Sequence, residues 1–376
     1  MTTPRIAVLG AGYTGVSIAG LLAKRTGATV TVVNERDRFV ERMRNHQLAA
    51  GRRQRHLSLR DLFDGTGIRL AVGRVTRIDT GERSVQLSGG VAPIDYDILV
   101  YALGSQAETD AVPGAAEHTY AIGVAERAGQ LRERMRTAAS VTVVGAGPTG
   151  LETVTDLAEA YPDRAVRLIA RGMLGDYLSE RARDHLHRVI DRLGVQVSEN
   201  AAVVKADAGG LVLADGSRAD ADAVAWTAGF RVPGLARETG LAVDEQGRVV
   251  VDATLRSVSH PEIYAIGDAA AAHTGDGRVL RMGCGPGQLS AACAYHAITA
   301  RLAGRTPAPL RVTNDALCVS LGRRDGILQP TDLDGRPRGR VITGRPVTAL
   351  KRLVLSVNGR LTPRYPGLVV AGARQG

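Results

Sequence analysis

The chain has 376 residues, of which 44% are hydrophobic and 23% are charged. This composition is typical of globular domains, and the length suits two or three of them, which excludes a disordered or fibrous protein. Glycine is frequent, with 45 residues, but it is concentrated in short loops and has no triplet period. Loops of this kind are candidate binding sites for phosphate groups.

The net charge of +10 comes from the C-terminal end of the chain. Residues 301–376 contain thirteen arginines and Lys351 against four aspartates. A solvated basic face and a contact with an anionic surface both fit this excess, but no aromatic stacking platform accompanies it, so we expect no nucleic-acid binding. No segment has the roughly 18 consecutive apolar residues that would span a bilayer. We therefore expect a cytoplasmic protein, with peripheral contact at the inner face of the membrane as the open alternative.

The cysteines do not form a ligand or redox pattern. Cys284, Cys293 and Cys318 include no CxxC pair, so neither a disulfide scaffold nor a zinc ribbon is expected, and we predict no metal site. We expect all three to fill the core as small apolar side chains.

A first glycine motif begins almost at the N-terminus, in the segment RIAVLGAGYTG. A short β-branched strand leads into Gly10, Gly12 and Gly15, and a helix-compatible stretch follows. The first glycine permits a tight turn, the second lets the backbone approach a pyrophosphate, and the third lets the helix pack on the strand. Glu35 ends the next predicted strand, 20 residues after Gly15, where a carboxylate binds ribose hydroxyls. The pattern predicts a dinucleotide-binding Rossmann unit.

The same motif recurs as SVTVVGAGPTG, with Gly145, Gly147 and Gly150. Here the strand that follows ends at Ala170, and Arg171 comes next, so no carboxylate occupies the ribose position. A guanidinium attracts a ribose 2′-phosphate, which favours NADPH at the second site. NADH, with Arg171 merely exposed, is the open alternative.

A third motif follows the two glycine loops in the chain. The apolar strand IYAI runs into Gly267 and Asp268. Taken together, these motifs resemble the two-dinucleotide-binding-domain flavoproteins, and the closest branch is that of type II NADH dehydrogenases and apoptosis-inducing-factor-like proteins. The resemblance implies that Asp268 binds the ribitol of FAD, that the first loop binds the FAD pyrophosphate, and that the second binds NADH or NADPH.

Two features select this branch of the superfamily. The segment FVERMRNHQLAAG holds no cysteine where related disulfide reductases carry a redox pair. The loop GPTGLE places Glu152 where the resemblance implies a carboxylate near flavin and nicotinamide. Its alternative is an ordinary acid in the first turn of a helix. His46, Tyr295 and His296 are candidate proton donors to a reduced acceptor, with structural roles as the alternative.

One motif departs from the resemblance. Type II NADH dehydrogenases carry AQxAxQ in the helix that this chain writes as GPGQLSAACAYHAITARL, but Ser290 and Ala292 replace the second alanine and glutamine. Gln288 remains as a candidate flavin or acceptor contact. The departure weakens the expectation of a quinone acceptor.

The predicted fold is α/β, with two Rossmann-like domains, the second inserted in the first, and a small C-terminal α+β region. The expected bounds are 1–110 and 244–305 for the FAD domain, 111–243 for the NAD(P) domain, and 306–376 for the basic region. By resemblance, the backbone near Val75 borders the FAD adenine. The cofactor contacts expected in the two domains are Gly10, Gly12, Tyr13, Gly15, Glu35, Arg36, Val75, Gly104, Gly145, Gly147, Gly150, Arg171, Gly229, Gly267 and Asp268.

The C-terminal region carries a predicted helix with Val347, Leu350, Val354 and Val357 at helical spacing. Such a helix can lie on an anionic membrane, pack on the FAD domain or form the seam of a homodimer, and the sequence leaves these options open. The leading function is hydride transfer from NAD(P)H to FAD and electron transfer to a quinone or other small acceptor. A soluble flavoenzyme acting on a specialised metabolite and a slow redox-sensing flavoprotein are the alternatives.

Overall fold

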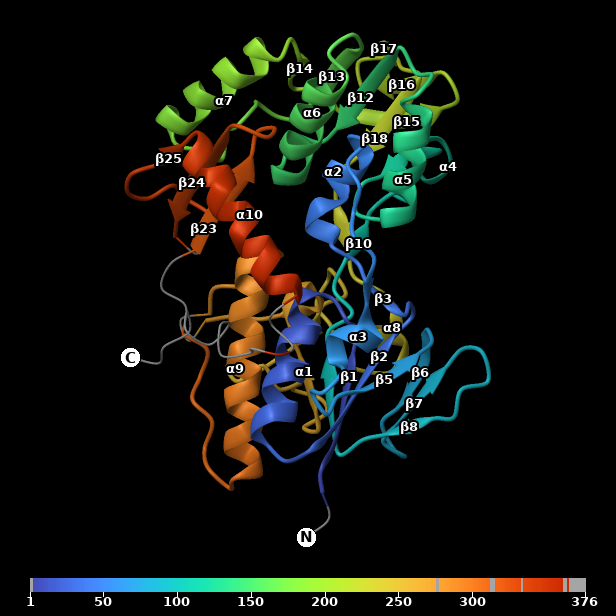
Figure 1. Cartoon of the computed structure of the whole chain (residues 1–376), viewed down its shortest axis with the longest axis vertical. Coiled ribbons are helices and arrows are strands. Elements are labelled where there is room, and N and C mark those ends of the chain that lie inside the picture. Colours follow the sequence, from blue (N-terminus) through green and yellow to red (C-terminus); the bar gives the residue numbers. More distant parts are fainter. Residues whose placement is uncertain (1–2, 275–276, 312–314, 333, 361–363, 365–376) are drawn as a thin grey trace.

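The computed structural model describes residues 3–274, 277–311, 315–332, 334–360 and 364. It contains two five-stranded parallel sheets with helices packed against them, and several smaller sheets of two or three strands (Figure 1). This arrangement confirms the predicted α/β fold class.

The first sheet has the strand order β21-β9-β1-β2-β5, and all its neighbours are parallel. Helices α1 and α9 lie side by side against this sheet (Figure 1). An antiparallel meander, β6-β7-β8, is attached to it. The bounds are β1 (Arg5–Leu9), α1 (Tyr13–Arg25), β2 (Thr29–Asn34), β5 (Arg69–Val72), β6 (Val75–Asp79), β7 (Ser84–Leu87), β8 (Ile94–Asp95), β9 (Ile98–Tyr101), β21 (Ile263–Ala265) and α9 (Cys284–Leu302).

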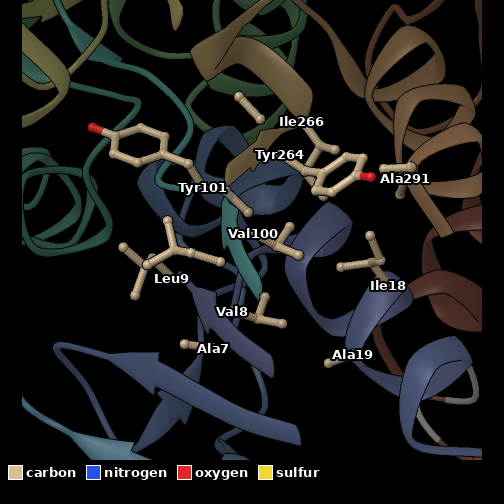
Figure 2. Packing of buried hydrophobic residues seen from close by; sticks show 14 of the residues in the cluster. Ala7, Val8, Leu9, Ile18, Ala19, Val100, Tyr101, Tyr264, Ile266 and Ala291 are labelled. Atoms are coloured by element: carbon tan, nitrogen blue, oxygen red, sulfur yellow. The ribbon is translucent and has the colours of Figure 1, made fainter. Parts of the chain in front are cut away.

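The core of this sheet explains its sequence pattern. Strands buried on both faces are continuous apolar runs, and β1 and β9 bury almost every side chain. Figure 2 shows Val8, Val100 and Tyr264 on the face of the sheet toward Ile18 of α1, and Leu9 and Tyr101 on the opposite face. This packing fixes the carboxyl ends of β1, β9 and β21, where the first loop and the Gly267–Asp268 turn emerge.

The second sheet has the order β11-β18-β12-β13-β14, again parallel throughout, with its own meander β15-β16-β17. Its strands come from the segment of the chain between β9 and β21. The first sheet therefore takes strands from the chain before this segment and one strand, β21, from the chain after it. The exact bounds of the domains remain predictions. The elements are β11 (Tyr120–Ala121), α5 (Ala125–Arg134), β12 (Ser140–Val144), α6 (Pro148–Ala160), β13 (Ala165–Ile169), α7 (Glu180–Arg192), β14 (Gln196–Ser198), β15 (Val203–Asp207), β16 (Gly210–Leu213), β17 (Arg218–Asp220) and β18 (Ala223–Trp226).

Short elements connect the two sheets. The antiparallel pair β10-β19 joins the two segments that pass between them, and α2 contacts both α5 and α6. The remaining short elements are β3 (Arg38–Phe39), η1 (Arg42–Arg44), α2 (Asn45–Ala49), β4 (Leu57–Ser58), α3 (Leu59–Phe63), β10 (Gln106–Ala107), α4 (Ala115–His118), β19 (Phe230–Arg231), α8 (Leu235–Glu238), β20 (Val249–Val250), η2 (Gly267–Ala269) and β22 (Ala270–Ala271).

The C-terminal unit is an antiparallel sheet, β23 (Asp315–Ser320), β24 (Gly326–Thr331) and β25 (Ile342–Thr343), followed by α10 (Arg345–Arg360). β23 packs against α6, and α10 packs on β23 and β24 (Figure 1). The apolar residues of α10 differ in burial: Val347 is buried, whereas Leu350 and Val354 are exposed. Arg374, the one basic residue that follows Arg364 in the sequence, lies outside the described part of the chain.

Candidate functional site

The first glycine loop is shaped to receive an anion. Gly10 has φ +100°, and a Cβ at Gly15 would meet the carbonyl oxygen of Gly10 at 1.9 Å, so both positions require glycine. A Cβ at Gly12 would meet nothing within 4 Å, which leaves open space above the loop. Gly12 is also the N-cap of α1 and provides no side-chain cap to the first-turn amides. These amides and the helix dipole face this space.

A cleft lies at the carboxyl ends of β9 and β21. It is lined by Gly267, Asp268, Pro286 and Gly287, among others. The Asp268 carboxylate accepts hydrogen bonds from the Ser105 hydroxyl at 2.7 Å and from the Gly283 amide at 2.9 Å. The turn before α9 therefore positions this carboxylate.

The side-chain amide of Gln288, on the first turns of α9, has both its polar atoms buried. Neither atom has a hydrogen-bond partner among the residues that the structure describes. Buried amides are normally satisfied, so this one points to a partner that is not part of the chain. The hydroxyl of Tyr13 is likewise buried without a described partner, and burial raises its pKa.

At the end of β2, Glu35 follows Asn34, whose side-chain oxygen accepts a hydrogen bond from the amide of Ala11 in the glycine loop at 3.0 Å. Glu35 forms an ion pair with Arg36, and Arg36 also pairs with Glu126 of α5 at 3.1 Å. The Glu35 side chain is half exposed. The structure therefore places the predicted ribose carboxylate beside the first loop.

The second loop repeats this geometry. Gly145 has φ +105°, a Cβ at Gly150 would meet the Gly145 carbonyl oxygen at 1.8 Å, and a Cβ at Gly147 would meet nothing within 4 Å. Gly147 caps α6 without a side-chain hydrogen bond, and Pro148 occupies the first turn. Arg171 follows β13, is exposed, and has no ion pair with any described residue.

Glu152, two residues past this loop, is buried at 8% exposure. Its Oε1 accepts hydrogen bonds from the Ser320 amide and the Ser320 hydroxyl, both at 2.9 Å, and forms an ion pair with Lys351 Nζ. Burial lowers the pKa of the Lys351 amine to about 7. Desolvation disfavours the charged form of the amine, and this is the cause of the shift. The pair thus offers a protonatable group that changes state near neutral pH.

His46 of α2 extends this buried group of charges. Its Nδ1 lies 2.8 Å from Asp156 Oδ2, and its Nε2 lies 3.0 Å from the carbonyl oxygen of Met43 and 3.6 Å from Glu152 Oε2. Both ring nitrogens therefore lie close to oxygen acceptors. Asp156 Oδ1 also accepts from Arg52 at 3.0 Å. The predicted pair of His46 and Glu152 is therefore brought together.

Other predicted residues are placed more simply. Gly104 and Gly229 have φ +66° and +75°, and Val75 opens β6. Tyr295 is buried in the core beside the first sheet, and His296 is partly buried next to it. The expectation that all three cysteines fill the core is wrong for Cys284, which is exposed at the start of α9. Within the described ranges no cluster of histidine, cysteine or acidic residues is suited to a metal ion.

Sequence reasoning missed Lys351, Ser320 and Asp156. Lys351 and Glu152 are 199 residues apart, and no local motif links them. One signal was present: the chain has 48 basic residues but only three lysines. A lysine in such a chain is notable because its amine can lose a proton, whereas an arginine keeps its charge.

The fold and the two loops define a flavoprotein with two dinucleotide-binding domains. A family model described as pyridine nucleotide-disulphide oxidoreductase matches residues 53–295, and a second model with this description matches residues 5–60. The chain belongs to the pyridine nucleotide-disulphide oxidoreductase family. It is an oxidoreductase, and this family implies the use of a flavin and NAD(P)H.

Curated relatives narrow the branch. An NADH dehydrogenase-like protein of Mycobacterium tuberculosis is 31% identical over 317 residues, which cover 76% of this chain and 77% of that protein. A type II NADH:quinone oxidoreductase of Staphylococcus haemolyticus is 26% identical over 391 residues, which cover 93% and 94%. The resemblance to type II NADH dehydrogenases is confirmed.

Solved structures show the same fold. The sulfide:quinone oxidoreductase from Aquifex aeolicus superposes with a TM-score of 0.81 at 18% identity, over 98% of this chain and 95% of its own. NDH2 from Plasmodium falciparum in complex with NADH gives 0.76 at 15% identity, over 98% of both chains. Among the described residues no helix is both long and apolar enough to cross a bilayer.

Proposed function

We propose that this enzyme takes a hydride from NADPH onto FAD and passes the electrons to a quinone. The observation that carries the proposal is the pair of uncapped glycine loops, each with open space at its second glycine, Gly12 and Gly147. Two such loops suit two dinucleotides. A demethylphylloquinone reductase of Synechocystis, 26% identical over 86% of this chain, and the staphylococcal relative support a quinone as the acceptor.

The residues around the first loop fit FAD. The α1 amides would hold the pyrophosphate, Glu35 the ribose and Asp268 the ribitol, while the unsatisfied amide of Gln288 would meet the ring system. When bound, the flavin supplies the chemistry, since it can accept a hydride and release electrons singly or in pairs. The protein contributes position and a helix N-terminus, that of α9, which favours negative charge.

The residues around the second loop fit NADPH. Arg171 is exposed at the end of β13 and has no acidic partner among the described residues. A carboxylate in its place would repel a 2′-phosphate. Its guanidinium is therefore available to a phosphate. We propose NADPH as the preferred donor on this ground.

Glu152 and Lys351 would supply protons to the electron acceptor. Reduction of a quinone consumes two protons, and the Lys351 amine, with its pKa lowered to about 7, can release one near neutral pH. Glu152 Oε1 holds the amine in place, and Ser320 holds Glu152. His46 would contribute to this proton supply from its position near the other oxygen of Glu152, Oε2.

The exposed side chains of α10 suggest how a lipid-soluble acceptor would reach the site. Leu350, Leu353 and Val354 are 44%, 62% and 43% exposed, and Arg345 and Arg352 flank them. Apolar residues beside arginines suit the interface of an anionic membrane. We propose peripheral binding at the cytoplasmic face through this helix.

The test separates the two half-reactions. The purified protein is mixed anaerobically with NADH or NADPH, and flavin absorbance is followed; the reduced protein is then mixed with a short-chain quinone. We expect rapid bleaching, faster with NADPH at low concentration, and rapid recovery with quinone. A protein that bleaches slowly and keeps a charge-transfer band would instead be a redox sensor, and a protein without flavin would refute the proposal.

A further inference from the structure

A second cavity lies apart from both glycine loops. Its volume is about 430 Å³, and it is lined by residues from three segments: Ala50, Gly51, Arg52, Glu159, Ala160, Arg323 and Arg324. The segments are the end of α2, the last turn of α6, and the turn between β23 and β24. The volume falls within the range of small-molecule sites. We call it the arginine cavity.

The charges that line the arginine cavity are mostly positive. Three guanidinium groups face one carboxylate, that of Glu159. Arg323 and Arg324 form no ion pair with any residue that the structure describes. Glu159 Oε2 accepts a hydrogen bond from the Arg323 backbone amide at 2.8 Å. Arg52 is paired with Asp156 at 3.0 Å, so Arg323 and Arg324 face the single lining carboxylate and the cavity keeps an excess of positive charge.

The turn that carries Arg323 and Arg324 is fixed from both sides. The Gly322 amide donates to Thr155 Oγ1 at 2.9 Å, which anchors the turn to α6. On the other side, Asp325 accepts from His185 of α7 at 2.7 Å and from Arg192 at 3.2 Å. The two arginines thus project from a backbone that is already ordered, which lowers the entropic cost of holding a ligand.

Arg52 is positioned in a similar way. Its amide donates to the Gln47 carbonyl oxygen at 2.9 Å, and one guanidinium nitrogen donates to Asp156 at 3.0 Å. Gly51, with φ +86°, makes the turn that brings Arg52 to the cavity. The remaining guanidinium donors are compatible with an oxyanion, because a guanidinium presents several N–H groups in a planar fork.

We propose that the arginine cavity is a binding site for a phosphate group, either free phosphate or a small phosphate ester. The site is distinct from both dinucleotide loops and does not depend on the acceptor proposed above. Arg52 also holds Asp156, which holds His46. A phosphate group bound to Arg52 would therefore contact a residue whose ion-pair partner, Asp156, also binds His46 beside Glu152.

The test measures binding rather than activity. Flavin-loaded protein, with its nicotinamide site saturated by NADP⁺, is titrated calorimetrically with inorganic phosphate and, separately, with glycerol phosphate. The variant combines Arg323→Ala with Arg324→Ala, and the matched control is Arg181→Ala, an exposed arginine of α7 that does not line the cavity. Flavin content is compared in all proteins to show that each is folded.

We expect binding in at least one arm, weakened at least about tenfold in the double variant and unchanged in the control. Tighter binding of glycerol phosphate would identify an ester as the ligand, and equal or tighter binding of phosphate would identify the free ion. Absence of binding in both arms would overturn the proposal. Equal binding by the double variant, or an equal loss in Arg181→Ala, would also overturn it, because the cavity arginines would then have no specific role.

Discussion

Lys351 of α10 and Glu152 of α6 form a buried ion pair that joins the C-terminal helix to the helix of the second glycine loop. Ser320 of β23 donates two further hydrogen bonds to the same carboxylate oxygen. The C-terminal unit therefore contributes directly to the polar group beside the second glycine loop.

The lysine of this pair gives the protein a predictable pH dependence. Its pKa is about 7 in the fold and 10.5 in the reference state. Between these values the unfolded chain binds the proton and the fold does not, so the free energy of unfolding rises with pH across this window, and this contribution is constant below pH 7. In Lys351→Met we expect the rise to be reduced by an amount on the order of a few kcal/mol.

Urea unfolding at several pH values within the window measures this slope. Lys205→Met, at an exposed lysine of β15, is the matched control and should keep the slope of the unaltered protein. Identical slopes in the unaltered protein and Lys351→Met would show that the amine is not desolvated.

Glu152→Gln removes the charge of the carboxylate but keeps an oxygen that can accept from Ser320. We expect normal flavin content and normal reduction by NADPH, with reoxidation by quinone slowed about a hundredfold, since proton supply is impaired. Stopped-flow reoxidation measures this, with Asp163→Asn, an exposed acid just after α6, as control. Unaltered reoxidation would leave Glu152 with a structural role only.

Asp268→Ala tests the flavin site. The carboxylate lies in the cleft at the ends of β9 and β21, and its loss would remove the proposed acceptor for a ribitol hydroxyl. A hydrogen bond to a charged group contributes about 1.5 to 3 kcal/mol, so we expect flavin affinity to fall at least tenfold and the protein to be purified largely colourless. The absorbance spectrum reports the flavin content; full occupancy would remove this role from Asp268.

Much of the site was predictable because the motifs are local. Gly10, Gly12 and Gly15 must turn the chain between a strand and a helix, and this requirement shows in the sequence. The partners of Glu152 were not predictable in this way. Lys351 and Ser320 reach it from the C-terminal unit, and only the packing of β23 and α10 on α6 brings them there. For the same reason the arginine cavity, built from three distant segments, leaves no sequence motif.

Arg171→Ala tests the choice of donor. A guanidinium contacts the 2′-phosphate of NADPH but has no such partner in NADH. We expect KM for NADPH to rise about tenfold or more, with little change for NADH. Steady-state kinetics with both donors measures this, and Arg188→Ala, at an exposed arginine of α7, serves as control. Equal changes for both donors would exclude contact with the 2′-phosphate.

A pair of valine variants tests most directly the assignment of the first glycine loop to flavin and of the second to nicotinamide. Gly12 and Gly147 have φ −74° and −73°, and an added Cβ meets nothing at either position. Valine should therefore be tolerated by the fold and should intrude only on a ligand. We predict that Gly12→Val is purified without flavin. We predict that Gly147→Val retains flavin but needs at least about tenfold more NADPH for the same rate of flavin reduction. Retained flavin in Gly12→Val together with lost flavin in Gly147→Val would contradict the assignment.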